Sequence, residues 1–317
     1  MMGHFNYKPA LKWIIAFAIF AFLGKMVWDN WNQVKGVPFT LQPFSFILST
    51  LIFAFSYFIQ VWAWYLITLK LKIAVSFPET IKSWFYSQLG KYLPGKVWLL
   101  LSRFYFYESK GLARTGISVA LYLEMAAVIV AAGLIFLAAL ILFKEMEPFY
   151  SGGQFWCWVP AFILLAFIFL HPKVLQGILN WILVQLKKEP ILLSISYSSI
   201  VWILFVCIVA WMIGGIGFYL FVDSVYPVSS NYILFLTGAL AISSTLGLIA
   251  IFAPSGLGVR EGALVYLLSF LMATPVAVII SILTRIWMTL IEIGLIGMIY
   301  LLGQLQKQEK KKTYGES

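Results

Sequence analysis

The stretch KYLPGKVWLLLSR, residues 91–103, decides how the chain is organised. Three cations, Lys91, Lys96 and Arg103, surround a Pro-Gly pair in a chain that is otherwise strongly apolar. Pro94 suits the first turn of a helix, and the glycine after it permits unusual backbone angles, so one helix is expected to end here and another to begin. The cations are either the ordinary positive charge of a cytoplasmic loop or a pocket for the phosphate of a lipid headgroup.

The composition around this stretch identifies the class of protein. Of 317 residues, 62% are hydrophobic and 11% are charged, and the mean hydropathy is +0.95, which is typical of an integral membrane protein. The net charge of +10 is attributed to membrane orientation and contact with anionic lipid, not to nucleic acid. The two cysteines lie in apolar runs and the two histidines are far apart, so no disulfide framework, metal site or cofactor is predicted.

Unbroken apolar segments predict the membrane spans, since a hydrocarbon core requires about 20 apolar residues in a helix. Six segments qualify or nearly do: 11–29, 43–69, 115–143, 156–171, 194–222 and 275–302. No cleavage site of the A-x-A type follows the first, so it is expected to remain as a span. Two further apolar regions, 80–108 and 231–272, are interrupted by Pro and Gly.

The distribution of Lys and Arg predicts the orientation. With the N-terminus in the cytoplasm, 17 of the 22 Lys and Arg residues fall in cytoplasmic segments, and the C-terminus is cytoplasmic as well. Segment 80–108 must then enter and leave from the cytoplasmic face, and segment 231–272 from the outer face. Broken hydrophobic segments in corresponding positions of two halves indicate a transporter site.

These observations predict an all-α polytopic protein of the cell membrane. It would have about six full spans and two re-entrant broken helical hairpins from opposite faces, arranged as an inverted repeat in one transmembrane domain, 1–317. The predicted parts are a first half, 1–172; a cytoplasmic interfacial helix, 173–190; a second half, 191–306; and a basic cytoplasmic tail, 307–317. A plain connector helix is the alternative for 173–190.

The second interruption, APSGLGVREG at residues 253–262, resembles the first in its Pro and Gly content. A new helix is expected to begin near Gly258, with its free N–H groups pointing into the membrane interior as an anion site. Arg260 and Glu261 would lie in its first turn. Charged residues at membrane depth are candidates for function, although the two could also pair with other residues and only lock the hairpin.

Two sets of polar residues have helical spacing. Lys96, Arg103 and Lys110 follow one another at intervals of seven, which predicts a basic stripe on one helical face. Polar residues also recur at spacings of four, four and three in the last span. They are Ser281, Arg285, Thr289 and Glu292.

Glu124 is an isolated carboxylate in the third span. It requires a partner in space, for which Arg260 or Arg285 is expected. Together with Glu261 and Glu292, these groups form either an ionic network that lines a cavity or a set of structural ion pairs.

At these residues the chain resembles the lysylphosphatidylglycerol synthase/flippase transmembrane family. The resemblance lies in the stretch LGKYLPGKVW, in the pattern of Pro254, Gly256, Gly258 and Glu261, and in the arginine of the last span. It implies a polytopic domain with re-entrant helices that moves an anionic or glycosylated lipid between leaflets. Members that transfer lysine have a large soluble domain after the membrane part, whereas this chain ends at Ser317 after a short basic tail, so aminoacyl transfer is not expected.

The predicted function is a lipid flippase, not an enzyme, for an anionic phospholipid or a polyprenyl-phosphate-linked glycolipid. One alternative is an intramembrane lipid-modifying transferase, although the chain has only two aspartates and no D-x-x-D motif for Mg²⁺. Another is a scaffold in a glycan or lipid synthesis complex; a second copy of the chain or the enzymes of such a pathway are then possible partners. The predicted substrate-binding residues are Lys91, Pro94, Gly95, Lys96, Arg103, Glu124, Pro254, Ser255, Gly256, Gly258, Arg260, Glu261, Arg285 and Glu292.

Overall fold

The computed structural model describes residues 25, 28, 35, 40–92, 97–143, 160–161, 163–164, 166–168, 170–185, 195–250, 253 and 256–314. The described residues form helices and turns, with no strand among them, so the prediction of an all-α fold is confirmed. The predicted spans 11–29 and 156–171 lie largely outside the described residues.

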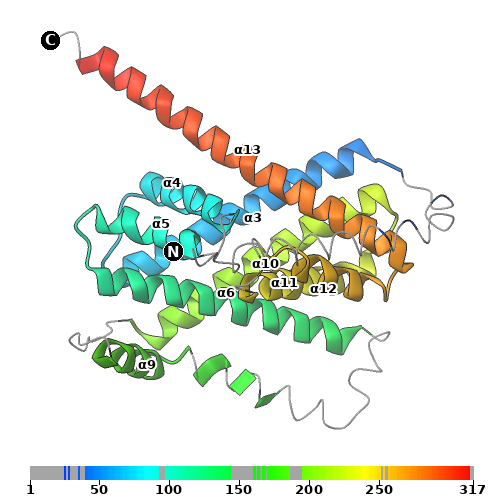
Figure 1. Ribbon diagram of the computed structural model, residues 1–317, viewed down its shortest axis with the longest axis horizontal. Helices are drawn as coiled ribbons and strands as arrows, with labels where there is room; N and C mark the ends of the chain where they lie inside the picture. The colour runs from blue at the N-terminus through cyan, green and yellow to red at the C-terminus, as the bar shows by residue number, and fades with distance from the viewer. Residues whose placement is uncertain are drawn as a thin grey trace, which may run out of the picture.

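The helices fall into two groups along the chain (Figure 1). The first group consists of α3 (Pro43–Lys70), α4 (Phe77–Gln88), the 3₁₀ helix η1 (Leu89–Tyr92), α5 (Val97–Glu108) and α6 (Arg114–Leu142). After α9 (Pro172–Gln185), the second group consists of α10 (Tyr197–Val225), η3 (Ser230–Tyr232), α11 (Ile233–Ile249), α12 (Val259–Leu268) and α13 (Thr274–Tyr314). Each group therefore contains a long helix, a hairpin of shorter helices and a second long helix.

Five stretches of the described residues are long and apolar enough to cross a membrane. Four of them, in α3, α6, α10 and α13, match predicted spans. The fifth, Ser230–Ile249, is the first arm of the predicted hairpin 231–272. That arm is long because its apolar sequence runs unbroken as far as Ile249, whereas α12 has only 10 residues.

Helix α4 begins with a capping box at Ser76. The Glu79 carboxylate accepts hydrogen bonds from the Ser76 backbone N–H at 3.3 Å and from its hydroxyl at 2.9 Å. Pro78 lies in the first turn, where no N–H donor is required. These residues fix the point at which the chain turns from α3 into the first hairpin.

Helices α3 and α10 lie side by side and antiparallel at the centre of the bundle. The backbone N–H of Gln42, before α3, donates to the carbonyl of Ser224, near the end of α10, at 2.9 Å. The helices approach closely because Gly217 faces α3; a Cβ atom there would lie 3.0 Å from the backbone nitrogen of Phe53. Trp287 of α13 stacks on Phe221 of α10 with 4.4 Å between ring centroids, which ties the last helix to this pair.

The packing of the two groups follows the same scheme. Helix α3 contacts α4, α6 and α13, and α10 contacts the corresponding α11, α13 and α6. Within the hairpins, α4–α5 and α5–α6 contacts correspond to α11–α12 and α12–α13 contacts, and the α6–α11 contact corresponds to the α13–α4 contact. Each hairpin therefore packs against the closing helix of the other group.

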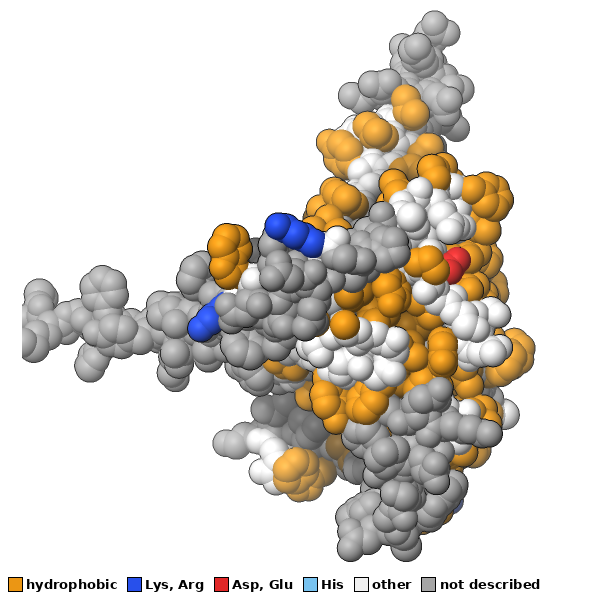
Figure 2. Space-filling model, turned by 90° about the vertical axis from the view of Figure 1, so that its right-hand side faces the viewer, with side chains coloured by type: hydrophobic (Ala, Val, Ile, Leu, Met, Phe, Trp, Pro, Cys, Tyr) orange, Lys and Arg blue, Asp and Glu red, His pale blue; other side chains and the backbone are white. Residues whose placement is uncertain are grey.

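The surface of the bundle is largely apolar. Among the described residues on the face shown in Figure 2, hydrophobic side chains are abundant and charged ones are few. Large exposed hydrophobic residues occur on α3 and α10, including Leu51, Phe55, Trp202 and Phe205. Such a surface is suited to contact with lipid acyl chains.

Helix α9 covers the first part of the segment 173–190, for which an interfacial helix was predicted, and residues 186–190 lie outside the described part of the chain. Its Leu175 is fully buried, whereas Trp181 is 66% exposed.

Candidate functional site

A cavity of ≈ 350 Å³ lies where the two groups of helices meet. Both hairpins and all four long helices α3, α6, α10 and α13 contribute to its wall. One set of lining residues is apolar and includes Leu99, Val128, Trp211 and Leu248. A second set is charged and consists of Lys91, Arg103, Glu124, Arg260, Arg285 and Glu292. The structure thus brings together six of the predicted site residues in one amphipathic cavity.

The end of the first hairpin supplies Lys91 to this cavity. Lys91 lies in η1, and its Nζ atom is 2.5 Å from the Glu292 carboxylate of α13, 201 residues later in the chain. The turn is tight because a Cβ atom at Gly90 would lie 2.5 Å from the backbone nitrogen of Leu99. Pro94, Gly95 and Lys96, which were also predicted here, lie outside the described residues.

The interruption of the second hairpin depends on two glycines with positive φ. Gly256 has φ 71° and Gly258 has φ 84°, a region that side-chain-bearing residues rarely adopt. A Cβ atom at Gly256 would also lie 2.7 Å from Cα of Gly247 on α11. Helix α12 begins directly after Gly258, as predicted. Pro254 and Ser255 lie outside the described residues.

Glu261 closes the start of α12. One carboxylate oxygen accepts the backbone N–H of Gly258 at 2.7 Å, and the other is 3.3 Å from Nη1 of Arg285 on α13. The Ser281 hydroxyl donates to the Glu261 carbonyl at 3.2 Å. Glu261 is 1% exposed, so its role here is to fix the helix start and to hold α12 against α13.

Arg260 points in a different direction from Glu261. Its Nη2 donates to the Met288 sulfur, and its stem packs over Gly247, where a Cβ atom would lie 2.8 Å from the Arg260 Cβ. Among the described residues, Arg260 forms no ion pair with a carboxylate. The prediction that Arg260 could pair with Glu124 is therefore wrong.

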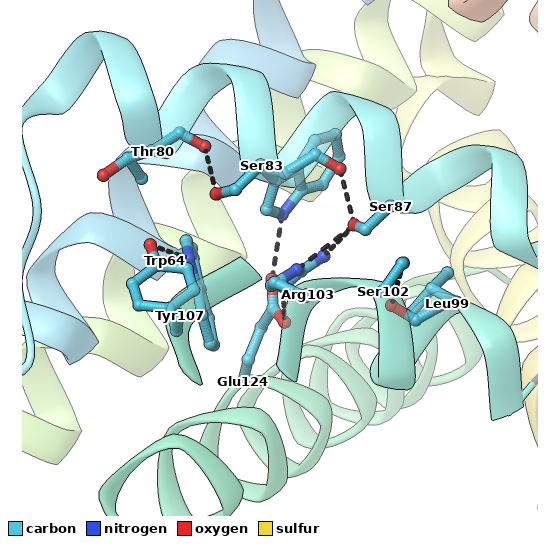
Figure 3. A network of polar contacts seen from close by, with 10 residues as sticks. Trp64, Thr80, Ser83, Ser87, Leu99, Ser102, Arg103, Tyr107 and Glu124 are labelled. Carbon is cyan, nitrogen blue, oxygen red and sulfur yellow. Dashed lines mark hydrogen bonds and ion pairs between the residues drawn. The ribbon is translucent and has the colours of Figure 1, made fainter. Parts of the chain in front are cut away.

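The partner of Glu124 is Arg103, across the interface between α5 and α6 (Figure 3). The prediction of Arg260 or Arg285 failed because α5 turns Arg103 toward α6, while Arg285 is engaged by Glu261. The second Glu124 oxygen accepts the Trp84 indole N–H at 2.9 Å.

Arg103 borders the cavity, but most of its side chain is covered by described side chains. Its Nε and Nη2 donate to the Ser87 hydroxyl at 3.2 and 3.0 Å, and its guanidinium carbon lies 4.6 Å from the centre of the Trp64 ring. The Trp64 indole N–H in turn donates to the Tyr107 hydroxyl at 2.9 Å. The Arg103 residue is 1% exposed, and the cation is satisfied by its partners.

The predicted basic stripe does not form as one face. Helix α5 ends at Glu108, so Lys110 lies in the following turn, where it pairs with Glu79 at 2.5 Å. Arg103 is buried and the side chain of Lys110 is 43% exposed, so the two cations serve different environments. Lys96 lies outside the described residues.

Several polar residues of the cavity were not predicted. They are Gln60, Gln88, Ser244, Thr245 and Thr289, of which only Thr289 belonged to a predicted stripe. The run of three hydroxyl residues at 243–245, within a helix that is otherwise apolar, was the available signal. Across the described part of the chain, no group of three or more His, Cys, Asp or Glu side chains is placed to hold a metal ion.

Comparison with known proteins places this architecture in a family. No curated protein and no solved structure matches the chain. The family described as lysylphosphatidylglycerol synthase TM region matches residues 13–297, a range that includes every residue that lines the cavity. The chain belongs to this family of membrane domains, as the resemblance in its two Pro-Gly interruptions predicted.

Proposed function

We propose that the protein is a lipid translocase that moves an anionic phospholipid or a polyprenyl-phosphate-linked glycolipid between leaflets, with the headgroup in the cavity. The observation that carries this proposal is the single cavity into which both interrupted hairpins and four cations converge. Phosphate oxygens are ligands for Lys and Arg, and the apolar wall suits the first carbons of the acyl or prenyl chains.

The lengths of α4, α5 and α12 support re-entrant helices, whereas the remaining hairpin arm, Ser230–Ile249, is long enough to cross a membrane. Helices α4 and α5 have 12 residues each and α12 has 10, which correspond to about 18 and 15 Å. A hydrocarbon core is about 30 Å thick, so none of these helices crosses it alone. Interrupted backbone at membrane depth is tolerated where it is buried in protein or lines a cavity. Described residues on both sides of each interruption, Lys91 and Leu99 in the first and Leu248 and Arg260 in the second, line the cavity.

The matching contacts of the two groups support an inverted repeat. Antiparallel α3 and α10 lie at its centre, and each hairpin packs against the closing helix of the opposite group. In each group, an ion pair joins the second arm of the hairpin to the closing helix: Arg103 to Glu124, and Glu261 to Arg285. Inverted repeats around a central site allow access to alternate between the two faces.

The Lys91–Glu292 pair is suited to couple the two halves. It is the ion pair that joins the tip of the first hairpin to the last long helix. An anionic headgroup that enters the cavity competes with Glu292 for Lys91, so that binding would loosen this contact. The orientation that places both termini in the cytoplasm follows from the Lys and Arg distribution and is part of the proposal.

The test is lipid movement in vesicles that contain the purified full chain. A headgroup-labelled fluorescent phosphatidylglycerol is exposed to an impermeant quencher, which bleaches only the outer leaflet unless the protein moves the lipid. A short-chain polyprenyl phosphoryl hexose with the same label forms the second arm. We expect movement of at least one probe with the wild-type protein, and its loss in Arg260→Ala and Lys91→Ala.

The matched control is Arg114→Ala. Arg114 pairs with Glu108 away from the cavity, its side chain is 72% exposed, and the variant is expected to retain transport. A wild-type protein that moves neither probe, or cavity variants that remain as active as the control, would refute the proposal.

A further inference from the structure

The charged groups at the cavity do not balance. Four cations line the cavity. Two carboxylates line it as well, and a third carboxylate forms an ion pair with one of the lining cations. The cations are Lys91, Arg103, Arg260 and Arg285, and the carboxylates are Glu124, Glu261 and Glu292. Each carboxylate pairs with one cation, and Arg260 is the cation that remains. The described part of the cavity therefore carries one excess positive charge.

The excess charge is located at Arg260. Its one hydrogen bond within the described structure goes to the Met288 sulfur, and a thioether is a weak acceptor that carries no charge. A guanidinium remains charged in proteins and is costly at membrane depth without an anion, so the cavity is suited to receive one.

Two hydroxyl groups that line the cavity also favour an anionic ligand. The hydroxyl oxygens of Ser244 and Thr245 are buried and have no hydrogen-bond partner in the described structure, and both residues line the cavity. They lie on α11 within one turn of Gly247, over which Arg260 packs. The adjacent Ser243 instead donates to the Leu240 carbonyl at 3.1 Å.

Unbonded buried hydroxyls are uncommon, because such a group loses its hydrogen bonds to water without replacement. Thr245 is 3% exposed, so bulk water does not compensate for this loss. The Arg260 guanidinium, which has no charged partner in the described structure, and the two unbonded hydroxyl groups line the same cavity. Phosphate oxygens accept from both types of donor, and a guanidinium binds two of them at once.

We propose that Arg260, Ser244 and Thr245 hold the singly charged phosphodiester of the transported lipid, in preference to a diphosphate linkage or a zwitterionic headgroup. This inference rests on the proposed function. One negative charge balances the described charges of the cavity, whereas a diphosphate diester adds a second negative charge that has no partner among them, in a site of low dielectric constant. A zwitterionic headgroup supplies its own cation and gains less from Arg260.

Binding of soluble short-chain probes to the purified full chain in uncharged detergent tests this preference. The probes are dihexanoylphosphatidylglycerol, a short prenyl phosphoryl hexose, the matching prenyl diphosphoryl hexose and dihexanoylphosphatidylcholine. Apparent Kd values are obtained from the shift of the unfolding temperature with probe concentration. We expect at least one phosphodiester monoanion to bind about tenfold or more tightly than the diphosphate and zwitterionic probes. The tighter of the two monoanions distinguishes a phospholipid from a prenyl carrier as the source.

Variants connect the preference to the residues. Arg260→Gln removes the excess charge and is expected to weaken monoanion binding about tenfold or more, whereas Ser244→Ala weakens it less. Glu292→Gln raises the excess to two charges and is expected to shift the preference toward the diphosphate probe. Arg114→Gln serves as the matched control and should leave all four Kd values unchanged. If Arg260→Gln does not fold, the Glu292→Gln shift and the Ser244→Ala loss still decide the question.

The outcomes separate this inference from the proposed function. Equal binding of monoanion and diphosphate probes by the wild-type chain would overturn the phosphodiester assignment, even if vesicles show lipid movement. An unchanged preference in Arg260→Gln or Glu292→Gln would overturn the role of the charge count. A clear monoanion preference without lipid movement in vesicles would support the site and refute the translocase.

Discussion

Removal of the Arg103 side chain is expected to be the most destabilising single change at the cavity. In Arg103→Ala, the Glu124 carboxylate would lose its cation while its side chain remains 12% exposed. Removing one partner of a buried ion pair costs about 3–5 kcal/mol, chiefly because the remaining charge is left uncompensated. The Trp64 and Ser87 contacts are lost as well, so we expect the upper part of this range for the free energy of unfolding.

Removal of both charges is expected to cost much less than removal of one. In the double variant Arg103→Met with Glu124→Gln, neither charge of this pair is left, and the amide oxygen is expected to accept the Trp84 indole N–H. Buried pairs that are replaced by neutral side chains of similar size are often close to neutral in stability. The double variant should therefore recover most of the loss, to within about 1–2 kcal/mol of the wild type.

The assay is unfolding in mixed micelles with increasing dodecyl sulfate, followed by tryptophan fluorescence, since Trp64 and Trp84 both lie beside the Arg103 guanidinium. The double-mutant cycle gives the coupling between Arg103 and Glu124 directly. A loss below about 1 kcal/mol in Arg103→Ala, or a double variant no more stable than that single variant, would show that the pair does not clamp α5 to α6.

Two further predictions concern the backbone and the surface. Gly256→Ala should destabilise the protein by about 1–3 kcal/mol, because φ at this position is 71° and the added Cβ would contact α11. The matched control is Gly262→Ala on α12, where an added Cβ meets nothing within 4 Å. This change should stabilise the protein by about 0.5–1 kcal/mol. The same micelle assay compares them, and equal effects would exclude backbone strain as the cause. The hydrogen bond from Lys110 lowers the pKa of Glu79 below its ordinary value of about 4.3. The ionised carboxylate therefore stabilises the fold fully at pH values above the ordinary pKa, and this contribution is lost as the pH falls through the lowered pKa. Wild type should thus exceed Glu79→Gln in unfolding temperature at pH 7 by a small margin that vanishes under acid conditions; a margin that grows on acidification would contradict this sign.

The sequence was sufficient for features that depend on local order. The spans matched by α3, α6, α10 and α13 were predicted because apolar runs of this length have few alternatives. The start of α12 was predicted because Gly258 adopts a conformation that few other residues tolerate. The length of α11 was not predicted as that of a possible span, because its residues belong to an apolar region that Pro and Gly interrupt, and the sequence does not show how the region divides between two helices.

The pairing of charges could not be predicted in the same way. Helical periodicity places Arg103 on a face of α5, but the rotation of the whole hairpin decides whether that face meets α6 or α13. The Lys91–Glu292 pair joins residues 201 positions apart, and its formation depends on the packing of every helix between them. The position of Arg103 beside Trp64 and Trp84 could not be predicted for the same reason, because these two aromatic residues come from different helices and must both approach one guanidinium.

The length of α13 connects the cavity mechanically to a point beyond the rest of the bundle. This helix has 41 residues, about 60 Å, and Figure 1 shows it extending beyond the rest of the bundle. From Glu292 to Tyr314 the rise is about 33 Å, so a tilt of about 10° at the ion pair would displace the far end by about 6 Å. A spin label at the end of α13 would therefore convert small rotations at Glu292 into larger displacements that distance measurements resolve.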